Sequence, residues 1–322
     1  MDVKIRTYSL DCLKAVSAFF VVIIHWGLDR ASTIDQVLLT VTNVAVPIFF
    51  MITGYFYPCF SNMKGGFGQY LFKIARMLVM AQVVYIVFSV GMNLLRGRVW
   101  FYPMSSIRDC CVTMVIEHTP PYGYHLWYFY ALIVALVIMW TIGRCGLDKI
   151  GFLLIPVLFI ANEILSYIGI YVRNFLFMAL PYLYLGYFVH VYEDCLLRFF
   201  DNGKLLVVFT VSCVLTMIDA YIQYNYWGRL QNQYLFLTLV VFCIFLYALR
   251  YPYSGRGSKM ALNGKAYSSH IYIWHILVGN CMWVLLGFLD VGIPRLYGSS
   301  VLSGILAYVL TLFCVRMIIR IK

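Results

Sequence analysis

The sequence predicts an all-α, polytopic membrane protein with about ten transmembrane helices and both termini in the cytoplasm. The first reason is composition: of the 322 residues, 63% are hydrophobic and only 11% are charged, whereas soluble domains are about 45–50% apolar and about 25% charged. The second reason is the spacing of the apolar stretches, and the third is the distribution of basic residues. This composition excludes a soluble enzyme, a disordered chain and a nucleic-acid-binding domain, so no nucleic acid partner is expected.

The apolar residues gather into stretches of membrane-spanning length. A helix that crosses a bilayer needs roughly 20 apolar residues. Because no polar stretch is long enough for a separate soluble domain, residues 1–322 are predicted to form a single integral membrane domain. The ten expected spans lie near residues 9–28, 36–57, 70–95, 124–142, 150–170, 174–192, 204–223, 233–250, 266–289 and 298–318.

The basic residues favour one side of the membrane. When the loops are assigned to alternate sides, seventeen of the 24 Lys and Arg residues fall on the side of the two termini and seven on the other. Cytoplasmic loops carry such an excess of positive charge, so the termini are predicted to be cytoplasmic. The longest predicted outer segment, residues 95–124, is expected to fold back over a site on the outer face.

The ten cysteines do not form a metal-binding or disulfide pattern. They are scattered through apolar runs, and the only adjacent pair is Cys110 and Cys111. Zinc sites and disulfide frameworks show regular spacings that are absent here. We therefore predict no metal site, and we interpret these thiols as small apolar side chains.

The first predicted span carries ionisable residues, which are costly inside a membrane and indicate a functional site by default. Lys14 and His25 are eleven residues apart, which places them on one helix face, roughly 16 Å apart along the axis. Asp11 lies one turn before Lys14 on nearly the same face. This stripe is expected to line a cavity. The alternative is that Lys14 reaches the inner interface and that His25 is a hydrogen-bonded packing residue.

Other polar residues are expected near the depth of His25. Glu163 falls in the outer half of the fifth span, where a carboxyl group must find a partner or stay protonated. His125 and Trp127 begin the fourth span at the outer surface. Their alternative role is as interfacial anchors. For His275, near the middle of the ninth span, lining of a pocket and a structural hydrogen bond are both open.

A pair of basic residues is expected on the cytoplasmic side. Lys73 and Arg76 are three residues apart at the start of the third span. Together with Lys14 they are typical of an anion site, since phosphates bind clusters of Lys and Arg. The alternative is attraction of positive charge to anionic lipid.

Five segments in order resemble the acyltransferase-3 family of bacterial integral membrane O-acyltransferases, over essentially the whole chain. In the segment 6–25, Lys14 stands where Arg is common and precedes His25 by eleven residues. In the segment 46–55, Thr53 replaces the Ser of the family's Ser-Gly-Tyr motif. Lys73 also stands where Arg is common, which weakens the directional contact to phosphate. The segments are 6–25, 46–55, 70–76, 125–129 and 267–275.

The resemblance implies a multi-pass enzyme of the bacterial cytoplasmic membrane that transfers an acyl group, usually acetyl from acetyl-CoA, to a hydroxyl of a surface polysaccharide or glycolipid precursor. It implies no tightly bound cofactor, with acetyl-CoA or another short acyl-CoA as donor. His25 would be catalytic, Lys14 its essential basic partner, and Lys73 and Arg76 part of donor binding. The oligomeric state and the identity of the acceptor stay open.

A mechanism consistent with these residues uses His25 as general base on the sugar hydroxyl, and an acyl-His intermediate is the second possibility. Glu163 or His125 would orient the base or bind sugar hydroxyls, Trp127 would stack on a sugar ring, and Thr53 and Tyr55 would donate to the oxyanion. The competing function is a transporter or flippase for a lipid-linked glycan, because intramembrane charges and interrupted helices also mark secondary carriers.

Overall fold

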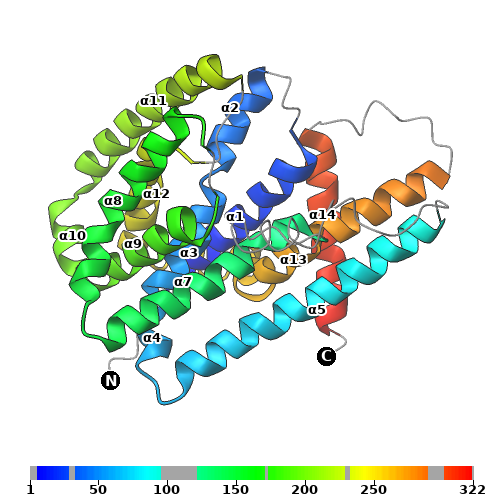
Figure 1. Ribbon diagram of the computed structural model, residues 1–322, viewed down its shortest axis with the longest axis horizontal. Helices are drawn as coiled ribbons and strands as arrows, with labels where there is room; N and C mark the ends of the chain where they lie inside the picture. Colours follow the sequence, from blue (N-terminus) through cyan, green and yellow to red (C-terminus); the bar gives the residue numbers. More distant parts are fainter. Residues whose placement is uncertain are drawn as a thin grey trace. The chain divides into compact units, whose positions relative to one another are not determined.

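The computed structural model describes residues 6–28, 33–95, 122–170, 173–228, 233–288 and 301–320. In these ranges every regular element is helical (Figure 1), which confirms the predicted fold class of an all-α chain. The elements are α1 (Tyr8–Trp26), α2 (Thr33–Thr42), α3 (Ala45–Tyr55), α4 (Tyr57–Ser61), α5 (Gly66–Leu95), η1 (Tyr124–Leu126), α7 (Trp127–Arg144), α8 (Asp148–Tyr167), η2 (Phe175–Ala179), α9 (Leu180–Val191), α10 (Glu193–Phe199), α11 (Asn202–Trp227), α12 (Leu235–Arg250), α13 (Lys259–Phe288) and α14 (Val301–Arg320).

Each of the ten predicted stretches coincides with helix, and the chain is a multi-pass membrane protein. Seven described helical segments are long and apolar enough to cross a bilayer, or eight if Phe175–Val191 and Glu193–Phe199 form one broken span. Helix α12 has only 16 residues, and the polar run 267–275 lowers the hydropathy of the long helix α13. The count of ten and the side of the termini stay predictions. The predicted outer segment lies mostly outside the described residues.

By its internal packing the chain divides into two compact units. Unit 1 comprises Met1–Phe49 and Tyr192–Lys322, and unit 2 comprises Phe50–Val191. Unit 1 therefore combines both ends of the sequence, and unit 2 is continuous. Each unit is described by itself below, and the predicted single domain over residues 1–322 stays a prediction.

Helix α1 is the centre of unit 1, and α13 is its main neighbour, with α14, α12 and α2 also in contact. The two helices run in the same direction along their full length. Near their beginnings a Cβ atom added to Gly264 would lie 1.7 Å from the main-chain oxygen of Asp11, and near their ends one added to Gly279 would lie 2.2 Å from the ring of Trp26. Glycine is required at both positions because the helices approach this closely.

Small and branched apolar side chains fill the space between α1, α13 and α14. Ala18, Val22, Ile271 and Ala307 are fully buried and form one cluster. Close approach through small residues is the usual way in which helices associate inside a bilayer, where apolar burial gives little driving force. The cluster fixes the rotation of α1 about its own axis and therefore the directions of its polar residues.

Both ends of α1 are anchored within unit 1. The main-chain N–H of Tyr8 donates to the oxygen of Pro252 at 2.7 Å, which satisfies one of the donors that a helix leaves unpaired at its start. At the other end the hydroxyl of Ser303 in α14 donates to the main-chain oxygen of Trp26. The last turn of α1, which carries His25, is therefore held in place by α14.

Unit 2 depends on a close crossing of α3 and α9. A Cβ atom added to Gly54 would lie 2.0 Å from the main-chain oxygen of Leu183, and one added to Gly186 would lie 2.0 Å from that of Met51. This contact explains the glycine of the segment Thr53–Tyr55. A larger side chain at Gly54 would push α3 and α9 apart, so the position of this segment depends on the glycine.

Candidate active site

The beginning of α1 holds a charge cluster of three residues. The Asp11 carboxylate accepts a hydrogen bond from Nε of Arg6 at 3.1 Å and from Nζ of Lys14 at 3.3 Å. The Asp11 side chain is only 9% exposed, and that of Lys14 is 26% exposed. Two cations therefore share one buried carboxylate, which leaves one unit of positive charge at this end of the helix.

His25 lies at the other end of α1 and faces a second histidine. Its ring stacks on that of His275 in α13, with ring centroids 5.2 Å apart and planes inclined by 29°. His275 is fully buried. Lys14 and His25 thus mark the two ends of a stripe that is roughly 16 Å long at the rise of an α-helix.

The hydrogen bonds of His275 define which ring nitrogen carries the proton. Nδ1 lies 2.8 Å from the main-chain oxygen of Tyr272 and 3.2 Å from that of Ile271. Carbonyl oxygens only accept, so Nδ1 must donate, and the neutral ring then carries its lone pair on Nε2. His275 therefore makes structural hydrogen bonds and also lies against the ring of His25, while its lining of a pocket stays a prediction.

In unit 2, Thr53 and Tyr55 both lie at the end of α3. The side chain of Thr53 shares a hydrogen bond with that of Tyr70 in α5. The ring of Tyr55 is buried and packs edge to face on His190 in α9, with centroids 5.3 Å apart. The hydrogen bond between the hydroxyl groups of Thr53 and Tyr70 thus joins two segments of the family resemblance, 46–55 and 70–76.

Lys73 and Arg76 lie in the first third of α5, and both are exposed. Their spacing of three residues places them near one another on the helix surface. Exposed basic side chains of this kind can form charged hydrogen bonds with a phosphate group. Because they belong to unit 2 and Lys14 belongs to unit 1, the predicted anion site of these three residues stays a prediction.

His125 lies in η1, Trp127 begins α7, and both are buried. The His125 ring packs edge to face on Tyr85 of α5, with centroids 5.0 Å apart, and the guanidinium of Arg173 lies over the Trp127 ring at 4.6 Å. Both roles predicted for these side chains, acceptor binding and interfacial anchoring, stay predictions. Glu163 lies in the last third of α8 and is half-buried.

Two of these relations are additional to the residues predicted from the sequence. Arg6, five residues before Asp11, forms an ion pair with it at 3.0 Å. The stacking of His25 on His275 joins residues that are 250 positions apart in the sequence, and no local pattern connects them.

The fold and the site together define a helical multi-pass membrane protein. Its site combines a charge cluster at the beginning of α1 with a pair of histidines, one from α1 and one from α13. Comparison with known proteins is more specific. The family model described as an acyltransferase domain matches residues 7–320. The chain therefore belongs to the acyltransferase-3 family of membrane acyltransferases.

The comparison with curated proteins adds little to this assignment. An amino-acid racemase of Enterococcus faecalis is 30% identical over 158 residues, which are 46% of this chain and 21% of the relative. The chain therefore spans about a fifth of the length of that curated relative. No solved structure matches the chain.

Proposed function

We propose that this membrane acyltransferase transfers an acetyl group from cytoplasmic acetyl-CoA to a hydroxyl of a surface polysaccharide or glycolipid precursor. The observation that supports it is the helix α1, which presents Lys14, held by Asp11, at one end and His25, stacked on His275, at the other. Lys14 is suited to bind the anionic acyl carrier, and His25 is suited to activate an alcohol. Another short acyl-CoA, such as succinyl-CoA, would fit the same chemistry.

The proposed arrangement has ten spans in the cytoplasmic membrane of a bacterium, with both termini inside. In this arrangement α1 is the first span and α13 the ninth, so both lead outward. The parallel packing of α1 and α13 supports the arrangement, because an odd number of crossings must lie between two spans that run in the same direction, and seven lie between the first and the ninth. Acyl-CoA then reaches the beginning of α1 from the cytoplasm.

In the proposed reaction His25 acts as general base. A ring nitrogen of His25 takes the proton of the sugar hydroxyl while the oxygen attacks the thioester carbonyl carbon. The carbon–sulfur bond then breaks, and the CoA thiolate leaves and receives the proton from His25. An acyl-His intermediate, in which the ring nitrogen attacks first, is the second route.

The other predicted residues have supporting roles. Lys14, Lys73 and Arg76 bind the phosphates of the donor, and Thr53 and Tyr55 donate hydrogen bonds to the oxyanion. His275 orients the His25 ring by stacking and lines the pocket. Glu163 or His125 orients the base or binds sugar hydroxyls, and Trp127 stacks on a sugar ring.

The experiment that tests this function uses inside-out membrane vesicles that contain the protein and a lipid-linked glycan. After addition of acetyl-CoA labelled in the acetyl group, we expect label on the glycan and an equal amount of free CoA thiol. A flippase, which is the competing function, would move the glycan without consuming acetyl-CoA. Absence of both label and thiol with several glycans would contradict the proposal.

The substitution Lys14→Met is expected to raise the KM for acetyl-CoA about 10–100-fold and to change kcat much less. A hydrogen bond to a charged group contributes about 1.5–3 kcal/mol, and methionine keeps the length of the side chain without its charge. Steady-state kinetics of thiol release measure both constants. The control Lys14→Arg, which introduces the residue common in the family, should keep the KM within a few-fold, and an unchanged KM in Lys14→Met would remove Lys14 from donor binding.

The substitution His275→Ala is expected to lower kcat about 10–100-fold, because the His25 ring loses the ring that orients it and misplacement of a reacting group costs up to about 10²-fold. A phenyl ring fills the same space and still stacks on His25, so the control His275→Phe should retain most of the activity. Single-turnover transfer of labelled acetyl measures the effect, with gel filtration to verify folding. A fully active His275→Ala protein would contradict the orienting role of His275.

A further inference from the structure

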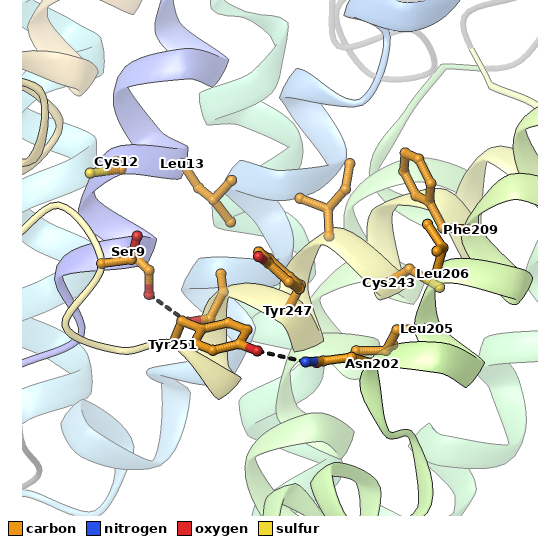
Figure 2. A pocket seen from close by; sticks show the side chains of 13 residues that line it. Ser9, Cys12, Leu13, Asn202, Leu205, Leu206, Phe209, Cys243, Tyr247 and Tyr251 are labelled. Carbon is orange, nitrogen blue, oxygen red and sulfur yellow. Dashed lines mark hydrogen bonds between the residues drawn. The ribbon is translucent and has the colours of Figure 1, made fainter.

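A cavity in unit 1 lies outside the candidate active site. It has a volume of about 420 Å³ and is bounded by α1, α11, α12 and the turn after α12 (Figure 2). This volume falls in the range of about 300–1,000 Å³ that is typical of small-molecule sites. Nothing in the proposed reaction uses this cavity.

The cavity lies on the opposite side of α1 from the catalytic stripe. Ser9, Cys12 and Leu13 are its lining residues from this helix. Cys12 and Lys14 are two positions apart and therefore point in directions about 160° apart. An occupant would contact the helix that carries Lys14 and His25 without entering the path between them.

The walls of the cavity are apolar along the helices and polar at one end. Leu206, Phe209 and Ile244 are apolar lining residues on α11 and α12. At the end where α11 begins and α12 finishes, the amide of Asn202 donates to the hydroxyl of Tyr251 at 2.6 Å (Figure 2). From Asn202 to Phe209 the cavity extends about 10 Å along α11.

This end of the cavity also carries positive charge. Arg250 immediately precedes Tyr251, and its guanidinium donates to the main-chain oxygens of Leu197 and Phe200. Lys204, two residues after Asn202, pairs with Asp201 at 3.5 Å. Lys204 Nζ also donates to the main-chain oxygen of Phe199 at 2.9 Å. This end of the cavity therefore has two basic side chains, Lys204 and Arg250, and one exposed acid nearby.

The opening of the cavity is formed by exposed apolar side chains. Leu206 is 65% exposed and Tyr247 is 56% exposed, although both belong to apolar helices. In a membrane protein such faces contact lipid. An occupant that enters from this side is a hydrocarbon chain with its polar group at the end near Asn202.

We propose that this cavity binds one acyl chain of an anionic phospholipid, with the headgroup near Asn202, Lys204 and Arg250. The apolar walls match the hydrocarbon chain, the polar end matches the ester and headgroup region, and the two cations match a phosphate. The bound lipid packs against the beginning of α1 and is separate from the acyl donor.

The test is photo-crosslinking of the full-length protein in nanodiscs, with phosphatidylglycerol that carries a diazirine in one acyl chain. We expect labelled peptides from α11 and α12, and about fivefold less labelling by the matching phosphatidylcholine, because a nearby basic residue favours anionic lipid. In Cys243→Phe the new ring occupies part of the cavity, and labelling there should fall about tenfold.

The matched control is Leu239→Phe, which adds the same ring on an exposed position of α12 and should leave labelling unchanged. Gel filtration of both variants separates loss of the cavity from loss of the fold. Equal labelling of wild type and folded Cys243→Phe, or equal labelling by the two lipids, would overturn the proposal. Displacement by long-chain acyl-CoA but not by unlabelled phosphatidylglycerol would also overturn it, because the cavity would then bind the donor.

Discussion

Replacement of His25 by alanine is expected to reduce the rate constant of acetyl transfer about 10²–10⁴-fold, the usual contribution of a general base. The affinity for acetyl-CoA should change little, because the proposed donor-binding residue Lys14 lies roughly 16 Å away along the helix. The measurement is single-turnover transfer of labelled acetyl by purified protein in lipid, together with the KM for acetyl-CoA. Full activity of the alanine variant would refute the assignment of His25.

The control for this substitution is His270→Ala, which removes a half-buried histidine from α13 five residues before His275. It should retain most of the activity. The same preparation distinguishes the two routes of catalysis. If His25 forms an acyl intermediate, wild-type protein incubated with labelled acetyl-CoA without acceptor will retain label on the peptide that contains His25, whereas a general base leaves the protein unlabelled.

The second large effect is expected at the crossing of α1 and α13. In Gly264→Ala the new methyl group would lie 1.7 Å from the main-chain oxygen of Asp11, so the helices must separate. We expect a loss of about 3 kcal/mol of stability, the upper end of the range for overpacking, and loss of transfer activity because His25 no longer stacks on His275. Thermal unfolding in detergent and the transfer assay measure the two effects.

Gly91→Ala is the matched control for this prediction. Gly91 also lies inside a long helix, α5, but a Cβ atom added there would have no neighbour within 4 Å. The same exchange should therefore be neutral or stabilising by about 0.5–1 kcal/mol, because alanine is the better helix former. If the two variants unfolded at the same temperature, the close approach of α1 and α13 would not limit stability.

Much of the fold follows from the sequence because apolar length is a local property. All ten predicted stretches are helical, and the predicted 124–142 and 150–170 differ by only a few residues from Tyr124–Arg144 and Asp148–Tyr167. The number of membrane spans is harder to predict from the sequence. Helix α12 has only 16 residues, and the helices Phe175–Val191 and Glu193–Phe199 are bent by 84° against one another, so apolar length alone does not give the number of crossings.

The candidate site was only partly predictable. Helical periodicity correctly places Asp11 beside Lys14, since residues three apart share a face. The partner of His25 could not be found in this way, because His275 belongs to a helix that pairs with α1 only in the folded chain. The role of Gly54 was also hidden, since its reason is the backbone of Leu183 in another helix.

The pairing of α1 with α13 has a consequence for biosynthesis. Roughly 250 residues separate Asp11 from Gly264, and at a synthesis rate of 5–20 residues per second the ribosome needs about 13–50 s to add them. During this interval His25 lacks the ring of His275, on which it stacks in the folded chain. A nascent chain that stops before Lys259 therefore contains the first helix but cannot assemble the histidine pair, and such a chain is a natural target for membrane quality control.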